Sequence, residues 1–310
     1  MGEKYYEVYY MMTALCNLSC SYCVLENSPL QLSMELPLGQ KQELIKHLYK
    51  DFNVRSIILS GGEPLCIGNN FGQDFISLMY FLKQYKSRDP QENLVVKLYS
   101  NGLMMTEDIV SSMNGIVDCV SINIDSCSDF VLQKIGRTNK MNGSFFKKAV
   151  ASIQLLYKYN IKVKLHTVVS ALNYDYIVNE VCTIYSIVKK ANPMLKKWKF
   201  FQYMSYDNPE KDMRHSISVE SFNTISSEIS RVLSCYDVKL HFKSIDEMDE
   251  SLFNVLATGI AQYRRNNDTW TTTQRTKSLF EYNSIDELLA DNDINKGLFE
   301  KYHSYNLFEK

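Results

Sequence analysis

Two periodicities of apolar residues alternate along the first two thirds of the chain. Short runs rich in β-branched and aromatic residues are typical of strands, and longer stretches with apolar residues three or four positions apart are typical of helices. The expected strands cover residues 5–13, 56–59, 94–100, 117–124, 162–169 and 196–202. The expected helices cover residues 37–50, 71–86, 107–113, 144–159 and 175–191. This alternation predicts an α/β fold, a partial (β/α)6 TIM-like barrel built on a parallel sheet.

The rhythm stops near residue 203. We therefore expect a barrel core over residues 1–203 and a C-terminal extension over 204–310 that closes the barrel. Residues 219–234 predict an amphipathic helix, and residues 239–245 can add a strand. The rest of the extension predicts a loop at 205–218, a helix at 246–259, a loop at 261–276 and a short helix at 284–289.

Alternation within the expected strands separates a polar face from an apolar one. On residues 117–124 the polar face carries Ser121 and Asn123, while the apolar face must meet the outer helices. The polar faces of neighbouring strands should therefore line the interior of the barrel. They carry Lys97, Tyr99, Asn101, Lys162, Lys164, His166, Lys197 and Lys199.

Lysines are unusual in a barrel interior, because desolvating an ammonium group is costly unless an anion compensates. One interpretation is that each lysine lies near a strand end and reaches water, and for any single lysine this is the simpler one. For Lys164, Lys197 and Lys199 together, on neighbouring strands, a polyanion such as a triphosphate is the better explanation.

Charge and composition restrict the partners. The 310 residues carry a formal net charge of −1, which argues against nucleic-acid binding and makes any cationic site a local feature. No apolar run reaches the length of about 18 residues that a membrane span needs, and no signal-peptide pattern is present. The eight cysteines show no disulfide-like spacing. We expect a cytoplasmic monomer with no membrane partner.

Three cysteines follow the first expected strand at the spacing C-x3-C-x2-C. Cys16, Cys20 and Cys23 can hold three irons of a [4Fe-4S] cluster, which leaves the fourth iron open to a ligand. A structural zinc site would need a fourth cysteine or histidine, and none follows before His47, which lies in an expected helix. Chance spacing is the other alternative. Tyr22 adds an aromatic face on which a purine could stack.

The cysteine loop resembles the cluster loop of the radical S-adenosylmethionine (SAM) enzymes. Residues 60–64, Ser-Gly-Gly-Glu-Pro, strengthen the resemblance because they match that family's GGEP motif, although a Gly-Gly pair alone is a weak signal. The resemblance implies a [4Fe-4S] cluster and SAM as cofactors, and a reductant of flavodoxin or ferredoxin type as partner. It also implies that Gly61, Gly62 and Glu63 hold the amino group of SAM.

A narrower resemblance is to viperin and its prokaryotic relatives, which act on nucleoside triphosphates. It is carried by residues 16–23, 60–64, 100–102, 125–126, 135–137, 163–165 and 197–202, with a weaker match at 278–289. It implies a CTP, UTP or GTP substrate in a site that the extension closes. A 5′-deoxyadenosyl radical takes the C4′ hydrogen, and loss of the 3′-hydroxyl as water gives a 3′-deoxy-3′,4′-didehydro nucleotide for antiviral defence.

The same resemblance assigns roles to individual residues. For the substrate it points to Ser60, Lys164, Lys197 and Lys199. For SAM it points to Asn101, Asn123 and Arg137, in addition to Tyr22.

The chain departs from the family pattern at several positions. Asn123 stands where viperins usually carry serine, and Lys197 where they usually carry arginine, which loses bidentate phosphate geometry. His166 stands where asparagine is common, and it either contacts the nucleotide or is only an interior histidine. The family's glycine-rich tail ending in tyrosine is not recognisable. Tyr302 or Tyr305 is the candidate for closing the site and supplying a proton or hydrogen atom.

Two other functions stay open from the sequence. A different radical SAM enzyme, peptide-modifying or glycyl-radical-activating, would use a peptide partner and ignore nucleotides. The absence of a second cysteine cluster in the C-terminal third counts against a peptide-modifying enzyme with auxiliary clusters. A non-enzymatic metal-binding module would hold zinc and no sulfide.

Overall fold

The computed structural model describes residues 4–23, 25, 34–137, 143–204, 208–263 and 274–307. Its strands form one sheet in the order β10-β9-β8-β1-β2-β3-β4-β5-β6-β7. Strands β1 to β8 pair in parallel, whereas β9 and β10 are antiparallel to their neighbours. The bounds are β1 (Tyr6–Met11), β2 (Val54–Ser60), β3 (Val95–Ser100), β4 (Val117–Asn123), β5 (Lys162–Val169), β6 (Lys197–Gln202), β7 (Lys239–Lys243), β8 (Phe253–Val255), β9 (Ile260–Tyr263) and β10 (Gln274–Ser278).

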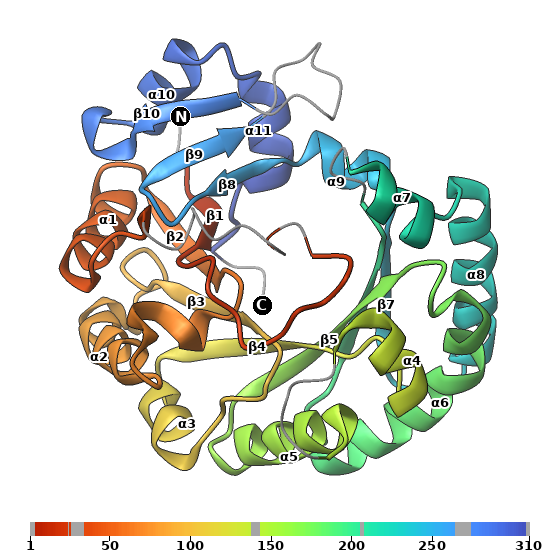
Figure 1. The fold of residues 1–310 in the computed structure, drawn as a ribbon. Helices are drawn as coiled ribbons and strands as arrows, with labels where there is room; N and C mark the ends of the chain where they lie inside the picture. The colour runs from red at the N-terminus through yellow and green to blue at the C-terminus, as the bar shows by residue number, and fades with distance from the viewer. Residues whose placement is uncertain are drawn as a thin grey trace.

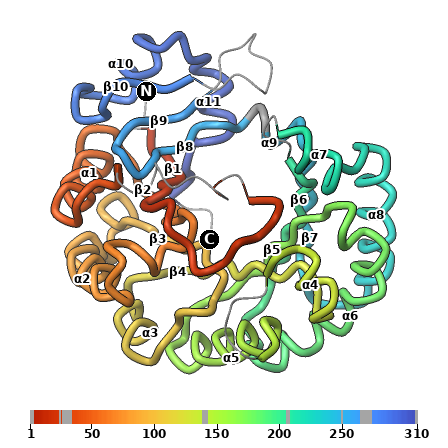
Figure 2. Tube along the Cα trace, viewed as in Figure 1, coloured from red at the N-terminus to blue at the C-terminus, as the bar shows by residue number. Residues whose placement is uncertain are grey.

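The sheet curves around a central axis, with the helices on its outer side (Figure 1), and the tube in Figure 2 follows the same path. The α-helices are α1 (Leu38–Lys50), α2 (Gln73–Leu82), α3 (Glu107–Met113), α4 (Asp129–Ile135), α5 (Phe145–Lys158), α6 (Tyr174–Ala191), α7 (Pro209–His215), α8 (Val219–Val232), α9 (Ile245–Glu250), α10 (Ile285–Asp291) and α11 (Lys296–His303). Short 3₁₀ turns are η2 (Pro64–Asn69), η3 (Lys83–Tyr85) and η4 (Leu279–Glu281). The partial TIM-like barrel is thereby confirmed.

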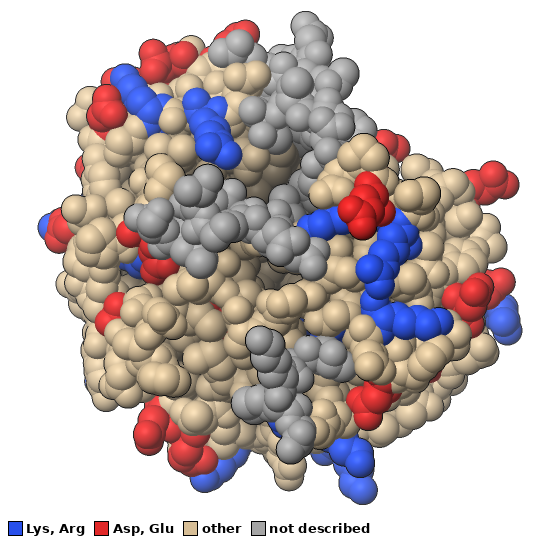
Figure 3. Space-filling model, viewed as in Figure 1, with Lys and Arg blue, Asp and Glu red and all other residues tan. Residues whose placement is uncertain are grey.

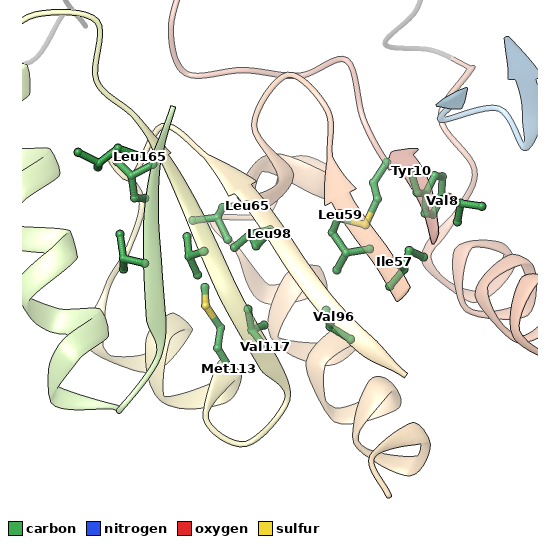
Figure 4. Packing of buried hydrophobic residues seen from close by; sticks show 14 of the residues in the cluster. Val8, Tyr10, Ile57, Leu59, Leu65, Val96, Leu98, Met113, Val117 and Leu165 are labelled. Atoms are coloured by element: carbon green, nitrogen blue, oxygen red, sulfur yellow. The ribbon is translucent and has the colours of Figure 1, made fainter. Parts of the chain in front are cut away.

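The hydrophobic core fills the space between the outer face of the sheet and the helices. Every second residue of a strand contributes, such as Val96 and Leu98 of β3 and Ile57 and Leu59 of β2, all without exposed surface. Figure 4 shows these side chains on one side of the strands, facing the helices. Burying an aliphatic side chain of this size stabilises the fold by about 1.5–3 kcal/mol, so the outer face fixes which residues must face inward.

The extension continues the same sheet at both of its edges. β7 falls within residues 239–245, where the sequence allows a strand, and it pairs with β6. β8 pairs with β1 at the opposite edge. The predicted helix 246–259 is wrong in its second half, because α9 ends at Glu250 and β8 follows. The predicted loop 205–218 contains α7. The predicted loop 261–276 is wrong at both ends, where β9 and β10 overlap it. Residues 205–207 and 264–273 lie outside the described part.

The segment after α11 returns to the start of β1. Phe299 of α11 packs against Tyr6 with ring centroids 5.6 Å apart, and Tyr6 forms an isolated antiparallel bridge with Ser304. The Tyr305 amide donates to the Tyr5 carbonyl at 2.7 Å. Residues 304–307 therefore lie at the amino-terminal end of β1. Within the described residues, no helix combines the length and apolar character needed to cross a membrane.

Candidate active site inside the barrel

The cysteine loop and the Gly-Gly-Glu-Pro turn are held together by backbone contacts. The Gly62 amide donates to the Thr13 carbonyl at 2.8 Å, and the Glu63 amide donates to the Leu15 carbonyl at 2.7 Å. A Cβ atom at Gly62 would lie 2.3 Å from the Leu15 oxygen, and one at Gly61 would lie 2.4 Å from the Thr13 oxygen. Only glycine allows this approach, so both glycines place the two loops side by side.

The three cysteines lie on this loop beyond the end of β1. Cys16 is exposed, Cys23 is half-buried and Cys20 is buried. Asn101, directly after β3, reaches the loop: its Nδ2 donates to Asn17 Oδ1 at 2.7 Å and lies 3.9 Å from Cys16 Sγ. The sequence-predicted residue Asn101 is thus brought to the cysteines.

Three thiols on one loop are a donor set that suits an iron–sulfur cluster. In the described residues, no group of three or more His, Cys, Asp or Glu side chains is gathered closely enough to hold one ion. Three thiols spread along one loop match a cubane in which each thiolate binds a different iron. The fourth iron would then have no protein ligand and would be open to a cofactor.

A buried ionic network anchors the other side of the loop. Arg137 Nε pairs with Asp125 Oδ2 at 2.5 Å, and the two side chains are only 4% and 0% exposed. The Tyr22 hydroxyl donates to Asp125 Oδ2 at 2.7 Å and accepts from Arg137 Nε at 3.1 Å. Burial raises the pKa of Tyr22 well above its usual range, so the phenol stays protonated. Tyr22 and Arg137 therefore hold the loop in place through Asp125.

The turn after α4 also packs on the cysteine loop. The Ser21 amide donates to the Ile135 carbonyl at 2.8 Å. Gly136 has a φ of +78°, and a Cβ atom there would lie 2.4 Å from the Ser19 oxygen. The sequence Ile135-Gly136-Arg137 is thus needed at this position for backbone geometry as well as for charge.

Glu63 is fully buried beneath the cysteine loop. Its carboxylate accepts hydrogen bonds from Ser100 Oγ and the Asn101 amide, both at 2.8 Å. Burial raises the pKa of Glu63 to about 7, although these hydrogen bonds oppose the shift. A buried carboxylate with a raised pKa is suited to pair with a cationic ligand group, because the cation would restore its charge.

Aromatic rings cross the lumen, the interior of the barrel, below the cysteine loop. Tyr9 contacts Tyr99 with centroids 5.5 Å apart, Tyr99 contacts His166 at 4.5 Å, and His166 contacts Phe201 at 5.1 Å. These four residues, the aromatic tier, come from β1, β3, β5 and β6. Their side chains meet because inward-facing residues of different strands stack in layers in barrels of this type.

Four lysines, the cationic tier, lie on the side of the aromatic tier away from the cysteines. Each precedes a member of the aromatic tier by two or four positions on the same strand face, and they are Lys97, Lys164, Lys197 and Lys199. Burial and mutual repulsion lower the pKa of Lys164 and Lys197, and lower that of Lys199 to about 8. The structure brings these lysines to the inner face of neighbouring strands, whereas Lys162, which the pattern also placed there, is exposed. Their role as a phosphate site stays a prediction.

Buried polar atoms in this part of the lumen lack partners. No hydrogen bond to a described residue is made by Ser121 Oγ, His166 Nε2 or His241 Nε2. Burial and the neighbouring lysines lower the pKa of His166 well below its usual range and that of His241 to about 4, so both rings are neutral. Orphaned polar atoms are costly, and a polar ligand among the lysines would satisfy them.

The sequence profile of the radical SAM superfamily matches residues 10–179. This match covers more than half of the chain, including the cysteine loop, the Glu63 turn and strands β2 to β5.

The chain belongs to the radical SAM superfamily.

Curated relatives include proteins with nucleotide substrates in their names. The S-adenosylmethionine-dependent nucleotide dehydratase RSAD2 of Oncorhynchus mykiss is 28% identical over 200 residues, 64% of this chain and 52% of the relative. A protein from Flammeovirga pacifica named S-adenosylmethionine-dependent nucleotide dehydratase is 22% identical over 197 residues, 61% and 59% of the two chains. The GTP 3′,8-cyclase of Chlorobaculum tepidum is 26% identical over 156 residues, 50% and 42%. The chain spans about half the length of these relatives.

Solved radical SAM structures share the fold. Streptococcus suis SuiB has a TM-score of 0.65 at 10% identity, over 95% of this chain and 66% of its own. The enzyme anSMEcpe with bound AdoMet has a TM-score of 0.64 at 17% identity, over 94% and 83%. At these identities the likeness establishes the barrel of radical SAM type and nothing about the substrate.

A radical SAM enzyme uses a [4Fe-4S] cluster and SAM, and both are cofactors of this protein. Cys16, Cys20 and Cys23 would hold the cluster, and Glu63 and Asn101, which lie beside the cysteine loop, would bind SAM. When bound, the pair supplies a radical that removes a hydrogen atom from a substrate. The chain itself holds the two loops together through the close approach of Gly61 and Gly62 to residues 13–15.

The remaining residues singled out from the sequence occupy different places. Ser60 is buried at the end of β2, where its carbonyl accepts from the Met12 amide at 2.8 Å. Asn123 ends β4, and its carbonyl lies 3.4 Å from Arg137 Nη1. These two residues therefore lie on the cysteine side of the lumen.

The two candidate tyrosines lie elsewhere. Tyr305 has its ring 5.7 Å from Lys97 Nζ, beside the start of β1. The Tyr302 ring lies 6.0 Å from Lys243 Nζ. β1 spans six residues at about 3.3 Å each, so Tyr305 and the cysteines lie at opposite ends of it.

Several residues of the site were given no role in the sequence analysis. Asp125 completes the Arg137 network, Glu7 pairs with Lys97, and His241 and Lys243 add polar groups to the lumen from β7. Alternation on β1 and β7 could have placed the last three on the inner face. No local signal pairs Asp125 with Arg137, because the contact depends on where α4 ends.

Proposed function

We propose that this enzyme is a viperin-like radical SAM nucleotide dehydratase, a lyase. Its substrate would be a nucleoside triphosphate, CTP, UTP or GTP, and its product the 3′-deoxy-3′,4′-didehydro analogue. The bound cofactors would supply the 5′-deoxyadenosyl radical that abstracts the C4′ hydrogen. Curated relatives named nucleotide dehydratases support this assignment.

The observation that carries the proposal is the cluster of buried lysines among unsatisfied polar atoms. Burial lowers the pKa of Lys164, Lys197 and Lys199 in the ligand-free enzyme, and repulsion from neighbouring lysines adds to the lowering. Ser121 Oγ and His166 Nε2 lack hydrogen-bond partners among the described residues. A chain of phosphates would relieve the repulsion and fill the missing hydrogen bonds, so it fits the lumen better than a peptide would.

The two ends of the lumen give the substrate a direction. The cofactors bind at the carboxyl ends of the strands, and the lysines lie deeper, toward the strand starts. A nucleotide with its phosphates on the lysines would pass its ribose along the aromatic tier toward the cysteine loop, where Ser60 and Asn123 lie. This places the sugar, rather than the phosphates, near the source of the radical.

Each side chain then has a simple task. The three lysines bind phosphate oxygens, and neutral His166 offers Nε2 as a hydrogen-bond partner to the substrate. Tyr22 and Arg137 position the cluster loop, and Asn123 and Asn101 face SAM. Tyr305 would close the end of the lumen beside Lys97. We propose only this closing role for Tyr305 and Tyr302, because a proton from either residue would have to cross the barrel to reach the ribose.

The biological setting follows from the same assignment. We propose an antiviral, cytoplasmic, monomeric enzyme that takes its electron from a flavodoxin or ferredoxin.

The test is anaerobic incubation of the reconstituted enzyme with SAM, dithionite and each triphosphate in turn. We expect CTP, UTP or GTP to stimulate 5′-deoxyadenosine formation, with a product lighter by one water, and the free nucleosides to have little effect. The Lys164→Met variant is the matched control, because it removes a phosphate contact and leaves the cysteine loop intact. The proposal fails if no triphosphate raises SAM cleavage above background.

A peptide substrate is the alternative that the same assay addresses. Copurification of a peptide together with indifference to every nucleotide would favour it. One zinc per chain and no sulfide in anaerobically purified protein would instead favour a non-enzymatic module.

A further inference from the structure

The lumen contains a carboxylate that anion binding does not explain. Glu7 precedes Tyr9 by two positions on β1, so it faces the cationic tier. Its Oε2 accepts a hydrogen bond from Ser56 Oγ at 2.6 Å and forms an ion pair with Lys97. Strands β1 to β7, all described, contain one other acid, Asp118, which bonds Lys86 on the outer side.

The charge of Glu7 reaches beyond Lys97. Burial would raise the pKa of Glu7, but Lys97 and Ser56 more than offset this and leave the pKa below its usual range, so the carboxylate is ionised at neutral pH. It also acts on Lys164 and Lys199, where it opposes the lowering of their pKa values. Glu7 thus weakens the positive field that any phosphate chain in the lumen would meet.

The lumen ends close to this pair. The Tyr305 ring stands 5.7 Å from Lys97 Nζ, and the His303 ring nitrogen Nδ1 lies 3.2 Å from the Glu7 carbonyl. The Glu7 carboxylate is among the charges that raise the pKa of Tyr305, after burial itself. A phosphate chain that enters from the cofactor side would therefore meet Glu7 and Lys97 with its last phosphate.

We propose that the Glu7–Lys97 pair limits the number of phosphates that the lumen accepts. The carboxylate offsets the positive charge of Lys97 and repels any phosphate beyond the third. The enzyme therefore selects a triphosphate over a longer and more highly charged chain. This inference rests on the proposed function and narrows its substrate class. It makes Glu7 a specificity-determining residue.

The test compares binding of inorganic tripolyphosphate and tetrapolyphosphate to the reconstituted enzyme by titration calorimetry. The proteins are the wild type, Glu7→Gln, Lys97→Met and the double variant. Their Glu7–Lys97 pairs carry net charges of 0, +1, −1 and 0. If the pair acts through its charge, affinity should follow the order Glu7→Gln, then wild type and double variant together, then Lys97→Met. A double-mutant cycle of this kind separates charge from shape.

The ratio between the two anions is the decisive readout. We expect Glu7→Gln to shift the preference toward tetrapolyphosphate at least about tenfold, since one charge nearby in a medium of intermediate dielectric is worth that much. Ser56→Ala, which removes a neutral hydrogen bond to the same carboxylate, should leave the ratio unchanged. A purely structural Glu7 would lower thermal stability in the Gln variant and leave the ratio alone, which would overturn the inference.

The two proposals fail differently. A wild type that binds triphosphates, with a ratio that Glu7→Gln does not move, sinks only the inference about Glu7. A wild type that binds neither polyphosphate nor nucleotide sinks the proposed function and this inference together. If Glu7→Gln does not fold, Lys97→Met and the double variant still order the affinities, and equal affinities for both would overturn the proposal.

Discussion

Arg137 and Asp125 form an ion pair that water hardly reaches, with 2.5 Å between Nε and Oδ2. The pair joins the turn after α4 to the segment that follows β4, and the Tyr22 hydroxyl links the cysteine loop to both side chains. Because both charges are buried, removing one leaves the other uncompensated.

We expect Asp125→Asn to destabilise the apoprotein by about 3–5 kcal/mol, because breaking the buried pair leaves the charge of the guanidinium uncompensated. Iron bound per chain after reconstitution should fall with it. Denaturant unfolding and iron analysis measure the two effects. Glu107→Gln is the control, because its partner Lys158 lies on an exposed surface where ion pairs contribute little. Full iron loading in Asp125→Asn would contradict the anchoring role.

Much of the barrel could be read from the sequence because its signals are local. The alternation of Val120 and Ile122 with Ser121 and Asn123 fixes which face of β4 is inside, and the structure confirms it. β8 could not be predicted in this way. It is three residues long, carries no period of its own, and exists because it pairs with β1, far away in the sequence.

The candidate site shows the same division. The lysines of β5 and β6 could be identified from the sequence, since a charge at every second position of a buried strand is rare. Glu7 could not be identified in this way, because a single acid among aromatic residues forms no repeating pattern. Its partner Lys97 comes from β3, and only the closed barrel brings them together.

The distribution of charge on the surface does not indicate the site either. Figure 3 shows Lys and Arg side chains over α7 and toward α4, with acidic groups beside them, and no single sign dominates this face. The cationic character lies inside the barrel, which agrees with a net charge near zero.

Lys164→Met should separate stability from binding. Replacing a buried, repelled ammonium with an apolar side chain should raise the melting temperature of the ligand-free protein. Tripolyphosphate affinity should fall by about tenfold or more, because a hydrogen bond to a charged group contributes about 1.5–3 kcal/mol. Thermal scans with and without tripolyphosphate check both effects. Lys162→Met, on the same strand but exposed, should change neither. Unchanged affinity in Lys164→Met would count against the phosphate site.

Lys199 gives anion binding a pH dependence. Its pKa is lowered to about 8, by burial first and then by the other lysines, so the unfolded chain binds more protons than the folded one between about pH 8 and the ordinary lysine range. Stability of the ligand-free enzyme should therefore rise with pH in that interval. Anion affinity should fall above about pH 8 as Lys199 loses its charge.

Calorimetry in buffers with different ionisation enthalpies measures this linkage, because tripolyphosphate binding near pH 8 should take up protons. The Lys199→Arg variant keeps its charge and should bind without the loss at high pH. Proton-neutral binding by the wild type at pH 8 would contradict the assignment.

Gly62 and Gly39 offer a matched pair of alanine substitutions. A Cβ atom at Gly62 would lie 2.3 Å from the Leu15 oxygen and 2.7 Å from the Ala14 oxygen, both of them backbone atoms. At Gly39, in the first turn of α1, nothing lies within 4 Å of the same atom. Gly62→Ala must push the cysteine loop away from the Glu63 turn, at a cost of at least about 1–3 kcal/mol. Gly39→Ala should instead stabilise the protein by roughly 0.5–1 kcal/mol, because alanine loses less entropy in a helix.

The iron content of the reconstituted protein shows whether Gly62 helps to hold the cofactors or only stabilises the fold. Since the Gly62 contact joins the two loops that frame the cofactors, Gly62→Ala should lose cluster loading and SAM cleavage even below its unfolding temperature. Gly39→Ala should keep both. If Gly62→Ala loaded iron and cleaved SAM like the wild type, the close approach of the two loops would be a feature of packing alone, and the glycine pair would have no part in holding the cofactors.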